Sequence, residues 1–264
     1  MELSLTQSAI THQIQNLEAW VGQQLFSRVG RGVRLTAAGE LFSETVRATL
    51  RTLLDGRERI EPYRNQDSVL LACPAEFVAG WLMGRLRLLR QLHHQIEVWL
   101  ITQDELEEID RIDVDLIISS KELKKSDMHS VQWISDQALA VCGPSIGEHL
   151  QGLRFPDVLV AVPLIVDEHY PEWAPWLASH NLATRRAITL EDPRLQLLAA
   201  EEEMGIAMVS SLVADAALRS GRVVVLPQIP PFSLPDKWLS KSNLKPRTPS
   251  VEVVFEWLLA EAAQ

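Results

Sequence analysis

The chain has 264 residues, a length that corresponds to about two domains, and 47% of them are hydrophobic. This content is enough to give each domain a core, so the composition excludes a disordered chain and a small disulfide-stapled fold. The net charge of −10 by itself argues against a nucleic-acid partner, so the distribution of charge along the chain has to decide.

The N-terminal part differs in charge from the rest. Residues 1–64 contain 8 arginines, no lysine and 7 acidic residues, whereas the other 200 residues contain 17 basic and 28 acidic ones. Arg28, Arg31 and Arg34 fall within seven positions that hold no acid. They predict either a local phosphate-binding surface or ordinary solubilising charge, and DNA therefore stays a candidate partner.

Signals for export and membrane insertion are weak. The longest apolar stretch, 69–84, contains Pro74 and Glu76 and falls short of the ~18 continuous apolar residues of a spanning helix. The N-terminus has neither the basic nor the apolar region of a secretory signal. Cys73 and Cys142 are too few for a disulfide framework. We expect a cytoplasmic protein with no membrane partner, in which these two thiols are either inert or a redox switch.

The first expected element is a helix from Thr6 to Val21. Thr6 is a suitable N-cap, and Gly22 suits the left-handed residue that ends a helix. Apolar residues recur every three or four positions and predict one buried face: Ile10, Ile14, Leu17 and Val21. The opposite face carries no carboxylate and either enters a major groove or is a solvated surface: Ser8, Thr11, His12 and Gln15.

Two short strands and a long helix follow. Leu25–Arg28 and Val33–Leu35 flank a flexible turn at 30–32, which predicts a β-wing. Thr36–Ile60 is free of proline and predicts a long helix with one apolar stripe: Phe42, Val46, Leu50, Leu53, Leu54 and Ile60. The small preceding unit cannot cover this stripe, so we expect a second copy of the helix as its partner. The polar segment 61–68 marks a domain boundary.

Beyond residue 68, strand and helix patterns alternate. The first set predicts strands at Val69–Cys73, Ile96–Thr102 and Val114–Ser119, a helix at Phe77–Leu92 and an acidic helix before Val114. A further strand, Ala138–Cys142, leads to a second set: strands at Pro163–Asp167, Ile206–Val209 and Val223–Leu226, and a helix Arg194–Met204 that closes on Gly205. Ser210-Ser211 then leads into another helix, and the strand Val223–Leu226 is followed by a proline-rich stretch, Pro227–Pro235.

This alternation predicts an α/β fold with a mainly parallel sheet that is covered on both faces. Because the pattern occurs twice, we expect two lobes joined by crossing strands. Such an arrangement places a ligand cleft between the C-terminal ends of strands and the N-termini of helices. The second part of the chain is therefore expected to bind a small molecule.

Several segments resemble LysR-type transcriptional regulators. The strongest likeness is the recognition-helix segment Leu5–Glu18, LTQSAITHQIQNLE, followed by Leu25–Arg28 and Arg34–Glu40. Segments of the effector domain are also similar: Trp81–Leu86, Asp113–Ile118, Trp173–Leu177 and Met204–Ala207. The resemblance extends over essentially the whole chain. It is nearest to the subgroup that regulates glycine cleavage, D-serine degradation and chromosomal β-lactamase.

The resemblance implies a domain order. A partial winged helix-turn-helix DNA-binding domain would occupy residues 1–35, a linker and dimerisation helix 36–61, and a periplasmic-binding-protein-like (type 2) effector domain 69–264. In that last domain lobe I would comprise about 69–142 and 236–264, and lobe II about 143–235. By the same analogy Ser8, Thr11, His12 and Gln15 would meet base edges, and Arg31 and Arg34 would meet phosphate or the minor groove.

Two functions stay open at this point. A standard unit of this kind has roughly 20 more residues before the position of Met1, which would cover the recognition helix. The chain is then either a DNA-binding regulator controlled by a small effector, or a DNA-incompetent truncated remnant. The remnant would bind a metabolite or form mixed dimers with a full-length relative. The regulator would act as a homodimer or a tetramer on double-stranded DNA.

The effector site is expected in the loops that follow the strands. Its candidate residues are Ala75, Glu76, Thr102, Ser119, Ser120, Asp167 and His169. The family often has Ser or Thr beside the position of Glu76, to bind a carboxylate, whereas this chain has Ala75 there. A zwitterionic or cationic effector, such as an amino acid or a related metabolite, is therefore expected. The alternative is that Glu76 only stabilises its own helix through the dipole.

Enzymatic motifs do not occur in the sequence. It has no Gly-x-Ser-x-Gly, His-Glu-x-x-His, Cys-x-x-Cys or Gly-x-x-x-x-Gly-Lys segment. His93 and His94 are adjacent and point in different directions on the expected helix, unlike metal ligands one turn apart. We therefore expect no catalytic residues, no metal site and no cofactor.

Overall fold

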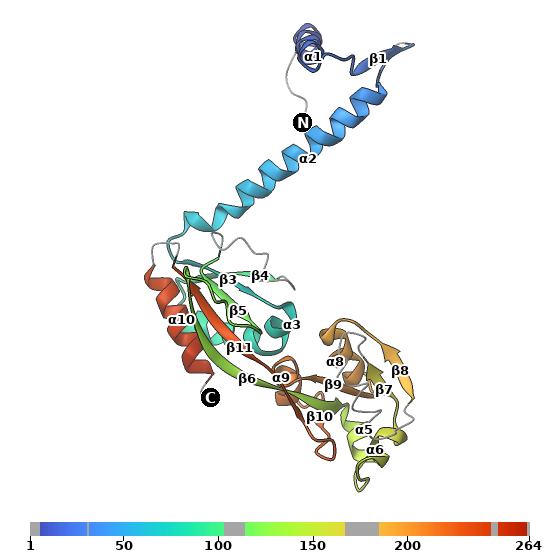
Figure 1. The fold of residues 1–264 in the computed structure, drawn as a ribbon, viewed down its shortest axis with the longest axis vertical. Helices are drawn as coiled ribbons and strands as arrows, with labels where there is room; N and C mark the ends of the chain where they lie inside the picture. Colours follow the sequence, from blue (N-terminus) through green and yellow to red (C-terminus); the bar gives the residue numbers. More distant parts are fainter. Residues whose placement is uncertain (1–5, 31, 103–113, 167–184, 244–247, 263–264) are drawn as a thin grey trace. The chain divides into compact units, whose positions relative to one another are not determined.

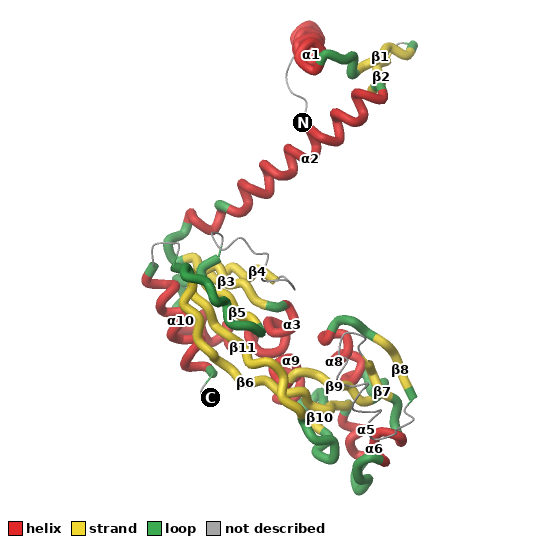
Figure 2. Tube along the Cα trace, viewed as in Figure 1, coloured by secondary structure: helices red, strands yellow, loops and turns green. Residues whose placement is uncertain are grey.

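The computed structural model of the chain describes residues 6–30, 32–102, 114–166, 185–243 and 248–262. Figure 1 shows the course of the chain, and Figure 2 its helices and strands. The chain divides into two compact units, Met1–Glu61 and Pro62–Gln264.

The first unit contains two helices and a two-stranded sheet. Its elements are α1 (Gln7–Val21), β1 (Phe26–Val29), β2 (Gly32–Leu35) and α2 (Ala37–Arg59). The Thr6 hydroxyl accepts a hydrogen bond from the Ala9 amide, and Gly22 ends α1 with φ 75°. The Thr36 hydroxyl accepts from the Gly39 amide at the start of α2. All four elements occur where the sequence predicts them, because each begins or ends on a local signal.

The apolar stripe of α1 is only partly covered. No described residue of this helix is buried, and Ile10 is 41% exposed. Ile14, Leu17 and Val21 are half-buried. The expected burial of the whole stripe is therefore not seen among the described residues.

The second unit is built on one mixed sheet. Its strands are β3 (Ser68–Cys73), β4 (Glu97–Thr102), β5 (Leu116–Ser119), β6 (Met128–Cys142), β7 (Leu164–Val166), β8 (Arg186–Thr189), β9 (Ile206–Ser210), β10 (Val224–Val225) and β11 (Phe232–Ser242). They follow the order β4-β3-β5-β11-β6-β9-β7-β8, and β10 pairs with β6. The pairs of β3 with β4 and β5, and of β7 with β8 and β9, are parallel.

Helical segments precede, connect and follow these strands. They are η1 (Glu61–Arg64), α3 (Ala75–Phe77), the π-helical turn η2 (Val78–Leu82), α4 (Met83–Leu92), α5 (Pro144–His149), α6 (Asp157–Ala161), α8 (Pro193–Glu201), α9 (Ser211–Arg219) and α10 (Pro249–Glu261). None of the described helices is both long and apolar enough to cross a membrane.

Separate cores divide the second unit into two lobes. In lobe I, β3, β5, α3, η2, α4 and α10 share one core, which contains Phe77 and Trp81 stacked 5.3 Å apart. In lobe II, α5 and α6 pack on one face of the sheet, whereas α8 and α9 pack on the other. In lobe II both faces of the sheet are therefore covered, as expected of an α/β fold.

Two long strands run through both lobes, and they correct the predicted topology. β6 starts at Met128 instead of Ala138, and β11, for which no strand was predicted, starts at Phe232 within the proline-rich stretch. Both strands are antiparallel to their neighbours, so the sheet is half parallel and half antiparallel instead of mainly parallel. The proline that obscured β11, Pro235, lies between Leu234 and Lys237, where the pairing with β6 shifts register.

The end of α8 also differs from the prediction. The helix stops at Glu201 instead of Met204, and the left-handed residue is Glu203, with φ 60°. The Glu203 carboxylate accepts hydrogen bonds from the Ser145 and Ile146 amides at the start of α5. This contact stabilises a conformation that a glutamate rarely adopts. The expected acidic helix before Val114 lies outside the described residues.

Candidate functional site

The polar face of α1 consists of four exposed side chains at helical spacing: Ser8, Thr11, His12 and Gln15. The Thr11 hydroxyl donates to the Gln7 carbonyl at 2.9 Å, so its lone pairs remain for an outside donor. His12 Nδ1 lies 3.2 Å from Asn16 Nδ2, which leaves Nε2 on the outer side of the ring. The face thus combines hydroxyl, imidazole and amide groups, which suit the donors and acceptors of base edges.

The strands of the wing separate its described arginines. Ser27 pairs with Arg34, and Arg28 pairs with Val33. Since successive side chains of a strand point to opposite faces, Arg28 and Arg34 leave opposite faces of the wing. Both are exposed. Arg31 lies outside the described residues.

Glu18 attaches the wing to α1. Its Oε1 accepts hydrogen bonds from the Leu25 amide at 2.8 Å and the Phe26 amide at 3.0 Å. The Thr36 hydroxyl donates to the Gln24 carbonyl at 2.7 Å and so ties the wing to α2. This role of Glu18 was not predictable from a local pattern, because its partners lie seven and eight residues further along the chain.

In the second unit, the candidate effector residues of lobe I gather at one edge of the sheet. The parallel strands β4, β3 and β5 are neighbours and end there, with Cys73 paired to Thr102. Ala75 and Glu76 begin α3 directly after β3 and are half-exposed. Thr102 and Ser120 are exposed, whereas the buried Ser119 donates its hydroxyl to the Lys121 carbonyl. Asp167 and His169 lie outside the described residues.

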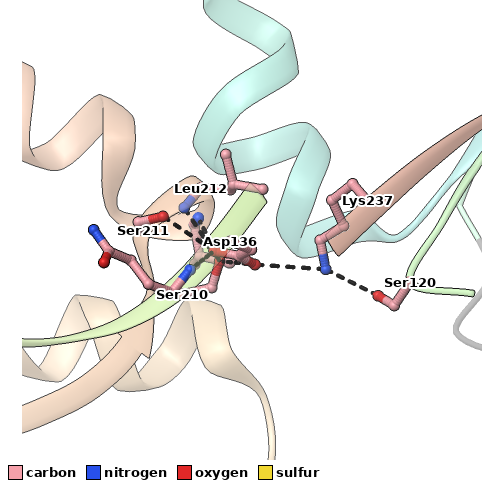
Figure 3. A network of polar contacts seen from close by, with 8 residues as sticks. Ser120, Asp136, Ser210, Ser211, Leu212 and Lys237 are labelled. Atoms are coloured by element: carbon pink, nitrogen blue, oxygen red, sulfur yellow. Dashed lines mark hydrogen bonds and ion pairs between the residues drawn. The ribbon is translucent and has the colours of Figure 1, made fainter. Parts of the chain in front are cut away.

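A polar network that the sequence analysis missed lies where β6 and β11 pass between the lobes. We call it the crossing-strand network, and Figure 3 shows its residues: Ser120, Asp136, Ser210, Ser211 and Lys237. The side chain of Asp136 has no exposed surface, and Lys237 Nζ lies 3.6 Å from its Oδ2. The same ammonium donates to the Ser120 hydroxyl at 2.9 Å. Ser210 and Ser211 had a sequence signal as the expected start of a helix, and Ser120 was a candidate effector residue, whereas Asp136 and Lys237 had no sequence signal.

The two cysteines are buried and free. Burial raises the pKa of Cys73 to about 12, and the nearby Glu76 carboxylate adds to this rise. Burial likewise raises the pKa of Cys142 to about 12, with Glu203 as the second cause. Because the thiolate is the reactive form, these values favour inert thiols over a redox switch. Among the residues with described placement, no three His, Cys, Asp or Glu side chains are grouped as metal ligands would be.

Comparison with known families bears on the two functions left open by the sequence, a DNA-binding regulator and a DNA-incompetent truncated remnant. The sequence pattern of the LysR substrate binding domain matches residues 64–263. That of the bacterial regulatory helix-turn-helix protein, lysR family, matches residues 1–40. The chain belongs to the LysR family. The predicted family, α/β fold class and function as a DNA-binding regulator with an effector domain are confirmed, and the truncated remnant is not favoured.

Relatives in this family are similar along almost the whole chain. The regulator BlaA of Proteus vulgaris is 26% identical over 264 residues, which are 99% of this chain and 89% of BlaA. The glycine cleavage system transcriptional activator of Escherichia coli K12 is 23% identical over 272 residues, 99% of this chain and 87% of the activator. This LysR family consists of transcriptional regulators, which are not enzymes.

Solved structures agree with the fold. The effector domain of AmpR from Pseudomonas aeruginosa has a TM-score of 0.58 and 21% identity, and the match covers 74% of this chain and 96% of that one. DarR of Vibrio fischeri, solved in complex with DNA, has a TM-score of 0.66 and 16% identity, with 97% and 90% covered.

Proposed function

We propose that this LysR-family chain reads DNA with the polar face of α1 and contacts phosphate or the minor groove with the wing. The observation that carries the proposal is the exposed row Ser8, Thr11, His12 and Gln15 within the part that matches the helix-turn-helix pattern. Arg34 and Arg31 are the proposed wing contacts. The attachment of the wing by Glu18 and Thr36 supports it, because both elements must meet one duplex in a fixed geometry.

Selection of DNA from a random duplex library tests this proposal. We expect the wild-type chain to enrich one sequence family, whereas a Gln15→Ala or His12→Ala variant enriches a different or more degenerate one. An Arg34→Ala variant should keep the same preferred sequence but bind all duplexes more weakly. A wild-type chain that enriches no sequence would contradict the proposal.

For the second unit we propose an effector site at the C-terminal edge of β3, β4 and β5, completed from lobe II. Its residues would be Ala75, Glu76, Thr102, Ser119, Ser120, Asp167 and His169. Glu76 supports an effector with an ammonium group, such as an amino acid or a related metabolite, because a carboxylate at this edge attracts a cation. Calorimetric titration with amino acids and with simple dicarboxylates tests it. We expect heat of binding from a member of the first set, and loss of that heat in Glu76→Ala.

We further propose that the chain acts as a homodimer, or as a tetramer of two dimers, in the cytoplasm. The support is the exposed apolar stripe of α2, in which Leu50, Leu53 and Leu54 are 54%, 66% and 57% exposed. A second copy of α2 would cover it. The effector would act by linkage: it can shift the arrangement of the lobes, and through it the contacts with DNA, only as far as it binds one arrangement more tightly.

A further inference from the structure

The crossing-strand network contains a carboxylate that is completely enclosed by its own chain. Both oxygens of Asp136 lie within 2.9 Å of the Ser210 hydroxyl, and the Ser211 hydroxyl donates to Oδ1 at 3.0 Å. The Gln137 amide donates to the same oxygen at 2.8 Å. Lys237 supplies the opposite charge. A buried carboxylate without partners would be strongly unfavourable, so these hydrogen bonds and the nearby ammonium offset the cost of burying the Asp136 side chain.

These partners include the first turn of α9. The Ser210 hydroxyl accepts from the Leu212 amide at 3.1 Å while it donates to Asp136. The carboxylate therefore lies one hydrogen bond away from the free amides of a helix N-terminus, the position at which a helix stabilises an anion. In this chain the anion at that position is the carboxylate of Asp136, a residue of β6 (Figure 3).

The helix α9 contacts both lobes. Leu212 belongs to the core of lobe I, whereas Ala214 and Ala217 belong to the core of lobe II. Its first turn lies so close to Gly80 in η2 that a Cβ there would meet the Val213 carbonyl oxygen at 2.3 Å. In α4, which continues directly from η2, the Arg85 guanidinium donates to the Asp215 carboxylate of α9 at 2.8 Å. A movement of one lobe against the other must therefore move α9 relative to η2 or to the crossing strands.

We propose that Asp136 is a built-in anion that holds the α9 N-terminus on the crossing strands and thereby couples the two lobes. Lys237 neutralises it and extends the coupling to Ser120 at the end of β5. Asp136 is thus a positioning residue. The inference deepens the proposed function, since an effector that rearranges the lobes has to act against this network.

Chemical rescue of the full chain tests the proposal. Asp136→Ala removes the carboxylate and leaves room for a small anion beside Ser210. We expect its second unit to unfold at a lower temperature than wild type, and sodium formate at tens of millimolar to raise that temperature by about 2–4 °C. Formamide, a neutral molecule of similar size, should give no such rise, and neither should sodium chloride at equal ionic strength.

A matched control is Asp192→Ala. The Asp192 carboxylate also begins a helix, α8, where it accepts from the Arg194 amide, but its side chain is 29% exposed. Water replaces this carboxylate, so we expect formate to change the unfolding temperature of Asp192→Ala and wild type by less than about 1 °C. Equal effects of formate and formamide on Asp136→Ala, or no effect of either, would overturn the proposal.

A second pair of variants covers the case that Asp136→Ala does not fold. Asp136→Asn keeps the shape and removes the charge, and Lys237→Met removes the counter-ion. We expect the double variant to unfold at a higher temperature than Lys237→Met alone, because Lys237→Met leaves a buried carboxylate unpaired. If the decrease in unfolding temperature of the double variant equalled the sum of the decreases in Asp136→Asn and Lys237→Met, the interaction between Asp136 and Lys237 would be contradicted. None of these measurements involves DNA or effector, so their failure is distinguishable from a failure of the proposed function.

Discussion

At the scale of single residues, two glycines of the same helix have opposite surroundings. A Cβ on Gly39 would lie 2.0 Å from the Leu25 carbonyl oxygen, whereas a Cβ on Gly56 would meet nothing within 4 Å. Gly39 therefore permits the close contact between α2 and the wing. Gly56 only weakens the helix, because glycine loses more conformational entropy on folding than alanine does.

Alanine at each position separates these effects. We expect Gly39→Ala to lower the free energy of unfolding of the first unit by about 1–3 kcal/mol through overpacking. We expect Gly56→Ala to raise it by about 0.5–1 kcal/mol, since alanine is the better helix former. Urea unfolding followed by circular dichroism measures both. Equal changes in the two variants would contradict the close packing of the wing on α2.

The two cysteines give a prediction for high pH. Their pKa in the folded chain is about 12, above the ordinary value of 9.0. The unfolded chain therefore loses thiol protons first, so stability that is present below pH 9 falls as the pH rises toward 12, by up to ~1.4 kcal/mol per pH unit for each thiol. Urea unfolding at pH 8 and pH 10 should show a smaller decrease in C73A/C142A than in wild type. An identical decrease would refute the raised pKa values.

Residues whose role is local were predictable, and those with distant partners were not. Thr6, Thr36 and Ser210 begin helices with bonds to amides two or three residues ahead. By contrast, Asp136 meets Ser210 across 74 residues, and Glu203 meets Ser145 across 58. A local sequence pattern cannot predict such pairs, because only the fold brings the two residues together.

At the scale of elements, α2 has an apolar stripe at helical spacing that the other described elements of the first unit do not bury. Four apolar side chains of its stripe are exposed, although the same spacing in a single-chain core would be covered: Val46, Leu50, Leu53 and Leu54. This difference is the reason to expect a second copy.

A glutamate in this stripe should prevent the association. We expect Leu50→Glu to lower the dimer mass seen by sedimentation to the monomer mass at micromolar concentration, because a charge cannot be buried in an apolar interface. Ala48→Glu places the same charge on the other side of α2 and should leave the mass unchanged. A wild-type chain that is monomeric under the same conditions would contradict dimerisation through α2.

The strands of the second unit differ in how well the sequence predicts them. β3, β4, β5, β7 and β9 were predicted because they are short apolar runs with clear ends. β6 and β11 were predicted in part or not at all, since they mix polar and apolar residues as they pass between lobes. Their polar residues, Asp136 and Lys237, weakened the strand pattern and also form the network.

At the scale of the whole molecule, the charge distribution agrees with two tasks. The N-terminal part is slightly basic and the remainder is acidic. Association with DNA should therefore depend on a few arginines of the first unit, and its salt dependence should be modest for a DNA-binding protein. The family match covers residues 1–40, which include α1, and we propose the exposed polar face of this helix as the source of specificity.

The central claim is that this face of α1 reads base sequence. It is tested most directly by measuring the affinity for the selected duplex and for a scrambled duplex over a series of salt concentrations. We predict that wild type prefers the selected duplex by at least about 10³-fold at physiological salt, and that Gln15→Ala reduces this ratio by about 10-fold or more while the salt dependence stays the same. Equal affinity of the wild-type chain for both duplexes would contradict the claim.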